Sequence, residues 1–195
     1  MKLLLTLLIL NIMTSLNNND SDLKKIYFGG GCFWCVEAVF EDVKGVKNVI
    51  SGYAGGDVEN PTYNQVTGGK TKHAEVCKII YDPSKINLQN LLEIFFLTHD
   101  PTTLNRQGND IGSHYRSIIL FNNANEENII NKYISEVNDS LFENKMVTQV
   151  QQINRFYNAE QYHQNYYKLN TQQPYCNAVI TPKVLSARKK LKKYY

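Results

Sequence analysis

Hydrophobic residues recur with two different periods along the chain from Lys24 onward. Short runs rich in apolar and β-branched residues predict strands, whereas longer runs with apolar residues three or four positions apart predict helices. Strands are predicted over residues 25–28, 46–53, 74–81, 116–121 and 147–153. Helices are predicted over residues 32–41 and 156–167, and around the apolar positions from 88 to 96 and from 130 to 141. This alternation indicates an α/β protein in which helices cover a sheet.

Polar residues mark the starts of two of these helices and the connections between elements. Asn87 precedes the helical run that starts at Leu88, and Asn123 with Glu126 three residues later resembles a capping box. Two long connections, around Asn60 to Gly69 and over residues 98–115, lack periodicity, and loops of that length in a compact domain are usually functional. We expect an irregular segment at the C-terminus, bracketed by Pro174 and Pro182.

The length of the chain favours one domain. It has 195 residues, of which 43% are hydrophobic and five are proline. A chain of this size can bury a proper core, and no linker divides it. We therefore predict a single catalytic domain over residues 23–195.

The first 22 residues differ in composition from the rest. Lys2 precedes an apolar stretch from Leu3 to Met13, and a polar run around Asn19 follows. The stretch is too short to span a bilayer and is typical of a secretory signal, although Thr14-Ser15-Leu16 fits a cleavage site poorly. We expect export to a periplasmic or other extracytoplasmic compartment. The alternative is a cytoplasmic protein with an N-terminal helix, whose leucine-rich surface would need a partner.

The charge is mild, with a formal net value of +3. Six of the 21 Lys and Arg residues lie between Lys183 and Lys193, and such a short basic run is more often a solvated end than a nucleic-acid patch. We expect a monomer that binds no nucleic acid.

Cys32-Phe33-Trp34-Cys35 follows three glycines at a predicted strand-to-helix turn. Amides at a helix start carry partial positive charge, which stabilises a thiolate. We expect Cys32 to be the nucleophile and Cys35 the resolving thiol. The alternatives are a buried apolar pair, a zinc site that lacks its other two ligands, and a thioredoxin-like thiol–disulfide exchanger.

Other residues that form hydrogen bonds lie in or beside the two long loops. They include Tyr63, Glu75, Asp110 and Tyr115. A carboxyl group near tyrosine hydroxyls can protonate and hold an oxygen atom, which a plain dithiol exchanger does not require. Each also has a structural alternative: Tyr63 caps a loop, Glu75 pairs with Arg116, or Asp110 holds a turn.

Together these segments resemble the A-type peptide-methionine sulfoxide reductases, the peptide-methionine (S)-S-oxide reductases. The match extends through most of the chain. In the first half the matching segments are Gly31-Cys32-Phe33-Trp34, Gly52-Tyr53-Ala54-Gly55-Gly56, Asn60-Pro61-Thr62-Tyr63, His73-Ala74-Glu75-Val76, Tyr81-Asp82-Pro83 and His99-Asp100-Pro101. In the second half they are Arg106-Gln107-Gly108-Asn109-Asp110, Tyr115-Arg116-Ser117, Ala159-Glu160, Tyr162-His163-Gln164 and Pro174-Tyr175-Cys176.

The resemblance implies a two-layer α/β plait of ferredoxin-like type with a mixed sheet, and it implies roles for individual residues. Cys32 would attack the sulfoxide sulfur and become a sulfenic acid, while Phe33 and Trp34 would wall the substrate methyl group. The residues that would bind the sulfoxide oxygen, protonate it or shape its pocket are Glu75, Tyr63, Tyr115 and Asp110. The substrates would be oxidised proteins or peptides and free methionine sulfoxide, with no cofactor and no metal.

The chain departs from many members of that family at Cys35, where glycine is commoner and the resolving cysteine lies in a C-terminal tail. Recycling would then run through a Cys32–Cys35 disulfide that thioredoxin or a similar protein reduces. Residues three apart in a regular helix have Cβ atoms about 5–6 Å apart, whereas a disulfide needs roughly 3.5–4.5 Å. We therefore expect the first helical turn to distort on oxidation. The role of Cys176 is open, and Cys77 is expected to be a core residue.

Overall fold

A computed structural model describes residues 23–195. The predicted secretory signal, residues 1–22, lies outside the described residues. Within the described part of the chain, no helix is both long enough and apolar enough to cross a membrane.

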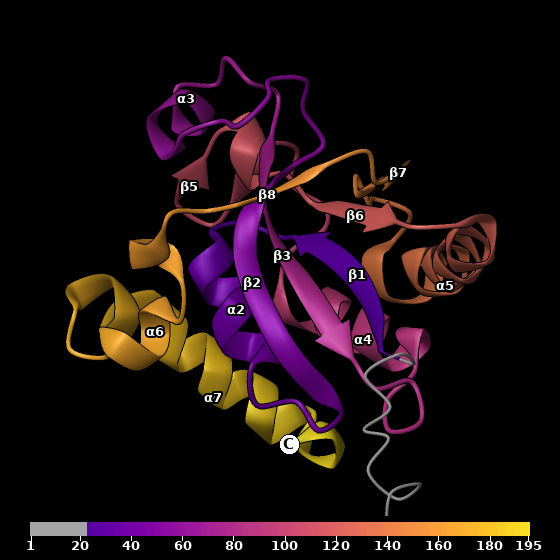
Figure 1. Ribbon diagram of the computed structural model, residues 1–195. Helices are drawn as coiled ribbons and strands as arrows, with labels where there is room; N and C mark the ends of the chain where they lie inside the picture. The colour runs from indigo at the N-terminus through magenta and orange to yellow at the C-terminus, as the bar shows by residue number, and fades with distance from the viewer. Residues whose placement is uncertain (1–22) are drawn as a thin grey trace, which may run out of the picture.

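A six-stranded sheet forms the centre of the molecule (Figure 1). Its order is β7-β6-β1-β3-β2-β8, and all neighbours are antiparallel except β6 and β7. The sheet is therefore mixed, as predicted. The strands are β1 (Lys24–Gly29), β2 (Val46–Ala54), β3 (Ala74–Tyr81), β6 (Ile118–Phe121), β7 (Gln149–Gln152) and β8 (Phe156–Asn158).

Four of these strands and two helices make a ferredoxin-like unit. Helix α2 (Phe33–Phe40) connects β1 to β2, and helix α4 (Leu88–Thr98) follows β3 and precedes β6 in the chain. The resulting strand order β6-β1-β3-β2 is that of the split β-α-β plait. Both helices lie behind the sheet in the view of Figure 1. The predicted two-layer α/β fold is confirmed.

Strand β3 shows how the alternation of side chains builds the two faces. Cys77 and Ile79 are fully buried and join the main core with the helices, whereas Val76 belongs to a smaller cluster on the opposite face. Glu75 shares the first of these faces and is also buried. The predicted face of β3 is therefore correct, and it places a carboxyl group beneath helix α2.

Both predicted helix caps form. The Asn87 side chain accepts a hydrogen bond from the Asn90 N–H at 2.9 Å, at the start of α4. Asn123 does the same for Glu126 at 3.1 Å, at the start of α5 (Ala124–Phe142). The Glu126 carboxylate accepts from the backbone N–H of Asn122 rather than from that of Asn123, so the box is shifted by one residue.

The two long loops contain short elements that their composition did not predict. The first holds α3 (Tyr63–Thr67), whose start is a full capping box between Thr62 and Gln65. The second holds the hairpin β4 (Arg106–Gln107) and β5 (Asp110–Ile111) and the 3₁₀ turn η3 (Ser113–Tyr115). These elements are too short to show a hydrophobic period.

The helix predicted over residues 156–167 is wrong. The structure has strand β8 there, then the 3₁₀ turn η4 (Gln161–His163) and the short helix α6 (Tyr166–Leu169). The cause is tertiary: β8 pairs with the edge of β2, and the Gln164 side chain bonds both the N–H and the carbonyl of Ser51. Aromatic residues also favour strands when an edge is present.

The C-terminal segment is helical rather than irregular. A turn of π-helix, η5 (Cys176–Ile180), leads into α7 (Thr181–Lys190), and the 3₁₀ turn η6 (Lys192–Tyr194) follows. Pro182 lies in the first turn of α7, directly after the π-helical turn. The prediction of an irregular segment between Pro174 and Pro182 is therefore wrong.

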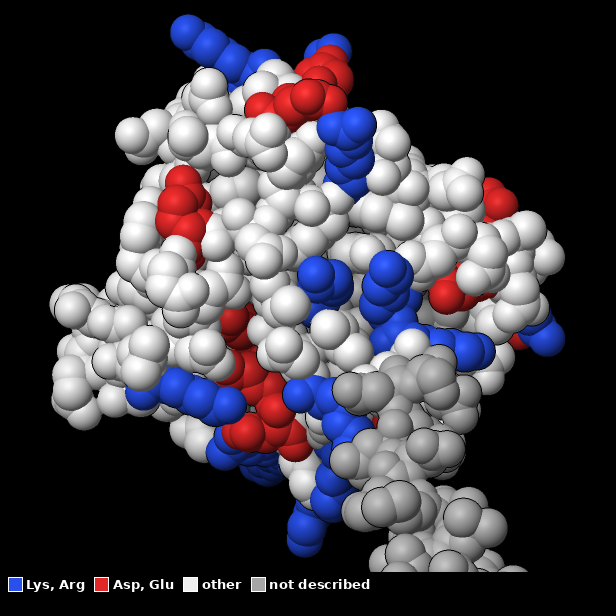
Figure 2. Space-filling model, viewed as in Figure 1, with Lys and Arg blue, Asp and Glu red and all other residues white. Residues whose placement is uncertain are grey.

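The basic C-terminal residues lie on helical turns whose apolar side is packed, and most of their own side chains are exposed, as expected for a solvated run. Val184 and Ala187 are buried, Arg188 pairs with Asp42, and Lys193 pairs with Glu93 at 3.1 Å. Figure 2 shows basic and acidic side chains interspersed over the visible face, most of which is uncharged.

Arg116 ties the end of the sheet to both long loops. Its guanidinium donates to Gln149 Oε1 at 2.9 Å and to the backbone carbonyl of Ser113 at 2.9 Å. It also donates to the carbonyls of Gly55 and Lys72. The alternative in which Arg116 pairs with Glu75 is therefore wrong, because all its bonds go elsewhere.

We expect Arg116→Met to lower the free energy of unfolding by about 3 kcal/mol, since it leaves several half-buried acceptors without a donor. Urea unfolding measures this. Arg155→Met is the control, because Arg155 is exposed and its ion pair with Glu59 lies at the surface. Equal urea midpoints for the two variants would contradict the prediction.

Candidate active site

The turn between β1 and α2 is shaped by glycine. Gly31 has a φ of +92°, and a Cβ atom there would lie 2.6 Å from Cγ of Gln107. Only glycine fits this combination of positive φ and close approach. Cys32 follows as the N-cap of α2, with φ −55° and ψ 125°. Cys32, the nucleophile expected from the sequence, thus lies just outside the helix. The prediction that the first helical turn distorts on oxidation assumed that Cys32 and Cys35 both lie within a regular helix, and this assumption does not apply.

Glu75 is joined to the start of this helix. Its Oε2 accepts a hydrogen bond from the Phe33 N–H at 3.0 Å, while its Oε1 is buried and has no hydrogen-bond partner among residues 23–195. Burial raises the pKa of Glu75 to about 8. The carboxyl group is therefore mostly protonated at neutral pH, and the O–H group at Oε1 is available to donate to a ligand.

The two thiols of the motif differ in their electrostatic environments. Burial, followed by the hydrogen bond with Cys35 and the nearby Glu75 carboxyl, raises the pKa of Cys32 well above its ordinary value. The hydrogen bond from Cys32, opposed by burial and helped by Lys183, lowers the pKa of Cys35 to about 7. The expectation that the helix start would lower the pKa of Cys32 is therefore wrong in the reduced protein, because desolvation outweighs the partial charge of the helix.

An aromatic wall stands beside the motif. The rings of Trp34 and Tyr166 stack with centroids 3.6 Å apart, and the His163 ring lies 4.9 Å from Phe33 and 4.6 Å from Tyr63. Phe33 is buried and Trp34 is partly exposed. The structure thus brings Phe33, Trp34 and Tyr63 together as expected, and it adds two rings to them.

His163 and Tyr166 are residues for which sequence reasoning proposed no role. Both lie within the segment wrongly predicted as one helix. The signal available was the match of Tyr162-His163-Gln164 to the family, which was noted without a role. Both ring nitrogens of His163 are buried with no hydrogen-bond partner in the described part of the chain.

Tyr63 opens α3 and is held there by Glu160. The Glu160 carboxylate accepts from the Tyr63 N–H at 2.9 Å and from the Tyr53 hydroxyl at 2.7 Å. Burial, then the charges of Glu75 and Cys32, raises the pKa of Tyr63 to about 12. The helix cap itself is Thr62, so the alternative in which Tyr63 caps the loop is wrong.

Tyr115 comes from η3 and faces the same groups. Burial raises its pKa, and the charges of Glu75 and Cys32 raise it further. Two neutral hydroxyls, those of Tyr63 and Tyr115, therefore share the electrostatic surroundings of Glu75, as expected from the sequence.

Asp110 lies on the other side of the thiols. Its Oδ2 accepts a hydrogen bond from the Tyr175 hydroxyl at 3.0 Å, and that hydroxyl lies 3.8 Å from the Cys35 sulfur. A cavity of about 590 Å³ opens here. Its lining residues are Cys32, Cys35, Gln107, Gly108, Asn109, Asp110, Tyr175, Ala178, Val179 and Lys183. Asp110 thus lies in the cavity wall with the two thiols. It belongs to β5, which pairs with β4 in a hairpin.

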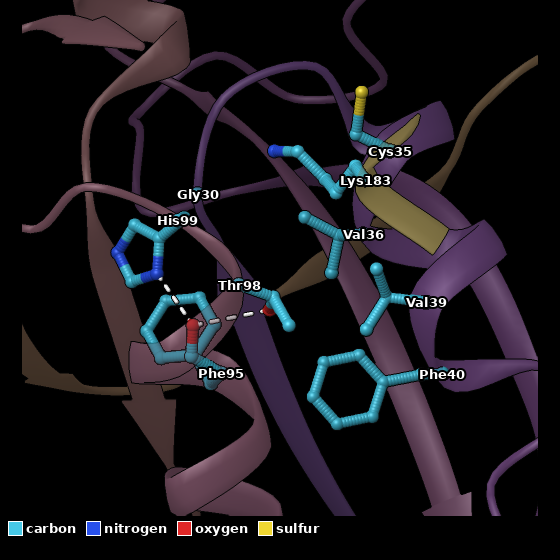
Figure 3. Close-up of a pocket in the computed structure, with 9 residues that line it drawn as sticks. All are labelled: Gly30, Cys35, Val36, Val39, Phe40, Phe95, Thr98, His99 and Lys183. Carbon is cyan, nitrogen blue, oxygen red and sulfur yellow. Dashed lines mark hydrogen bonds between the residues drawn. The ribbon is translucent and has the colours of Figure 1, made fainter. Parts of the chain in front are cut away.

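Lys183 is a further residue that the sequence did not single out. It comes from α7 and borders both this cavity and a smaller one between α2 and α4, which Figure 3 shows with Cys35 beside it. Its position in a short basic run concealed it, because such a run is usually a solvated face.

The remaining cysteines do not line the cavity. Cys77 is fully buried, and its thiol donates to the Phe33 carbonyl at 3.3 Å, as expected for a core residue. Cys176 is also fully buried, at the start of η5. Among residues 23–195, no three or more His, Cys, Asp or Glu side chains are grouped so that they could hold a metal ion, so the zinc alternative has no ligand set there.

Comparison with known proteins agrees with this site. The family model for peptide methionine sulfoxide reductase matches residues 24–195. The peptide methionine sulfoxide reductase MsrA of Trichodesmium erythraeum is 52% identical over 174 residues, which cover 89% of this chain and 96% of that protein.

Solved structures show the same likeness. Reduced Mxr1 of Saccharomyces cerevisiae is 34% identical with a TM-score of 0.75, covering 81% of this chain and 91% of that chain. Mxr1 in complex with Trx2 is 26% identical with a TM-score of 0.54, covering 74% and 86%. From the family match over residues 24–195 and the site around Cys32 and Glu75, this chain belongs to the peptide methionine sulfoxide reductase family.

Proposed function

We propose that the site reduces methionine S-sulfoxide, in proteins and as the free amino acid, through a sulfenic acid on Cys32 and a Cys32–Cys35 disulfide. The chain is an oxidoreductase that reduces methionine sulfoxide with a thiol. The observation that supports the assignment of residues best is the buried Glu75, held by the Phe33 N–H and carrying an oxygen without a partner.

Glu75 acts as the acid in this proposal. A sulfoxide sulfur becomes electrophilic when its oxygen is protonated, and a carboxylic acid kept neutral by burial can supply that proton at neutral pH. The hydroxyls of Tyr63 and Tyr115 are also neutral and hold the oxygen. Phe33 and Trp34 form an apolar wall for the methyl group, and Asp110 shapes the pocket from the other side.

The bonds change as follows. Glu75 protonates the sulfoxide oxygen as the Cys32 sulfur bonds to the sulfoxide sulfur, and the Cys32 thiol proton passes to the Glu75 carboxylate. The hydroxyl then moves to the Cys32 sulfur as the bonds from the methionine sulfur to that sulfur and to oxygen break, which leaves a sulfenic acid and reduced methionine. Cys35 attacks the sulfur of that acid, so an S–S bond forms, the S–O bond breaks and water leaves. A reducing dithiol then restores both thiols.

Activity should depend on Glu75 and on its protonation. With methionine S-sulfoxide as substrate, we expect Glu75→Gln to slow single-turnover methionine formation about 100-fold or more, because the amide supplies no proton. In the native enzyme the rate should fall as pH rises above about 8, where the carboxyl loses its proton. Glu59→Gln, an exposed change, is the control.

This assay also separates the reductase from a plain thiol–disulfide exchanger. Cys32→Ser should abolish methionine formation. Full turnover in Glu75→Gln, or an unchanged rate through and beyond pH 8, would show that Glu75 is not the acid. Equal rates with the R epimer would contradict the stereochemical assignment.

The disulfide should join Cys32 to Cys35. Peptide mapping by mass spectrometry after one turnover should find this bond in the native enzyme and in Cys176→Ala, since Cys32 and Cys35 are the thiols that line the cavity. Cys35→Ser should leave a Cys32 sulfenic acid that dimedone traps. A bond from Cys32 to Cys77 or Cys176 in the native enzyme would contradict this scheme.

Thioredoxin is the reductant in this proposal. The support is the yeast relative Mxr1, which has been crystallised with Trx2. With thioredoxin, thioredoxin reductase and NADPH, turnover should continue in the native enzyme and stop after one round in Cys35→Ser.

We also propose that the protein is exported, on the basis of Lys2 and the apolar stretch from Leu3 to Met13. N-terminal sequencing of the mature protein should find a chain that starts after this stretch. Retention of Met1 or Lys2 would support the cytoplasmic alternative.

A further inference from the structure

Lys183 places an ammonium group at the cavity that holds both redox thiols. It comes from α7, in the first half of that helix, and borders the 590 Å³ cavity together with Cys32 and Cys35. It also lines the smaller cavity with Cys35, Gly30 and Val36, where Figure 3 shows its side chain next to that of Cys35. It is only partly exposed.

The ammonium group is not used in an ion pair. Other basic residues of the C-terminal segment pair with carboxylates, Arg188 with Asp42 and Lys193 with Glu93. Among the described residues no carboxylate oxygen lies within the 4.0 Å of an ion pair with Lys183. A half-buried cation without a carboxylate partner is stabilised by an anion in the same cavity.

The charged and titratable groups that face Cys35 limit which anion this is. Asp110 is the carboxylate of the cavity, but it already accepts the Tyr175 hydroxyl at 3.0 Å. The Cys35 sulfur lies 3.8 Å from the Tyr175 hydroxyl oxygen. The bond to Asp110 directs the hydroxyl proton of Tyr175 away from that sulfur. Cys32 shares a hydrogen bond with Cys35, and burial keeps its thiol neutral. Lys183 is thus the cation that faces Cys35, and Cys35 is the thiol able to become its anion.

We infer that Lys183 is a positioning residue for the resolving step, holding Cys35 as the thiolate that attacks the Cys32 sulfenic acid; this rests on the role proposed above for Cys35. In that step the Cys35 sulfur bonds to the Cys32 sulfur, the S–O bond breaks, and the departing hydroxide takes a proton from solvent in the open cavity. The ammonium group loses its anion when the disulfide closes, so the interaction exists only before resolution.

The test compares Lys183→Met, which removes the charge and keeps the length, with Lys183→Arg, which keeps the charge. Lys189→Met is the matched control, on the same helix and exposed. The first measurement is the pH profile of Cys35 alkylation by iodoacetamide in the Cys32→Ser background, followed by mass spectrometry. In this background the midpoint of the profile should be about one pH unit higher in Lys183→Met than in the enzyme that keeps Lys183.

The second measurement lets dimedone compete with Cys35 for the sulfenic acid in otherwise native enzyme. A higher pKa of Cys35 in Lys183→Met leaves fewer thiolates at low pH but makes each thiolate more nucleophilic. Resolution should therefore be about threefold slower in this variant at pH 6 and about 2.5-fold faster at pH 9. The ratio of dimedone adduct to disulfide should change by these factors in opposite directions. A loss of packing alone would change this ratio in the same direction at both pH values.

The outcomes separate the two proposals. If Lys183→Met matches Lys189→Met in both measurements, or if Lys183→Arg behaves as Lys183→Met does, the inference is overturned while the role of Cys35 stands. If Cys35→Ser still forms a disulfide from Cys32 at the native rate, the proposed resolving role of Cys35 fails, whatever Lys183 does. A crossover with pH that Arg restores supports the inference.

Discussion

The hydrogen bond from the Phe33 N–H to Glu75 is the interaction on which the site depends. It joins the first turn of α2 to β3 across 42 residues of sequence, so it fixes the Glu75 carboxyl group against the start of the helix, next to Cys32. It also uses one carboxyl oxygen and leaves the other without a partner. Because the helix amide would otherwise be unsatisfied, and because burial favours the neutral carboxyl, one contact serves both the fold and the chemistry.

Charge in the site is divided between two sides of α2. On the side of β3, Glu75 and the thiol of Cys32 are buried and neutral, with aromatic rings around them. On the side of α7, an open cavity contains the charges of Lys183 and Asp110 and the thiol of lower pKa. The first side suits proton transfer to a sulfoxide oxygen, and the second suits an anionic thiol that must later meet a reductant. The N-cap position of Cys32 allows its sulfur to border both.

Elements whose signal is local could be predicted from the sequence. The alternation in β3 and the caps at Asn87 and Asn123 depend on neighbours in the chain, and the structure confirms them. The segment from β8 to α6 could not be predicted, because its conformation depends on the edge of β2 and on the bond of Gln164 to Ser51. The same holds for the site residues. Cys32 and Cys35 could be predicted from their spacing in the sequence. His163 and Lys183 could not, because only the packing of distant segments brings them to the site.

The position of the C-terminal helix is consistent with the proposal that the second thiol of the motif, Cys35, resolves the sulfenic acid. Val184 and Ala187 bury α7 against the core, and Tyr194 bonds to Glu93 and Asn90 on α4, so this segment is fixed beside α2 rather than free to approach Cys32. Its cysteine, Cys176, lies fully buried at the start of η5. What α7 contributes to the cavity is the ammonium group of Lys183, which lies beside the second thiol of the motif, and the proposed resolving step uses these two groups.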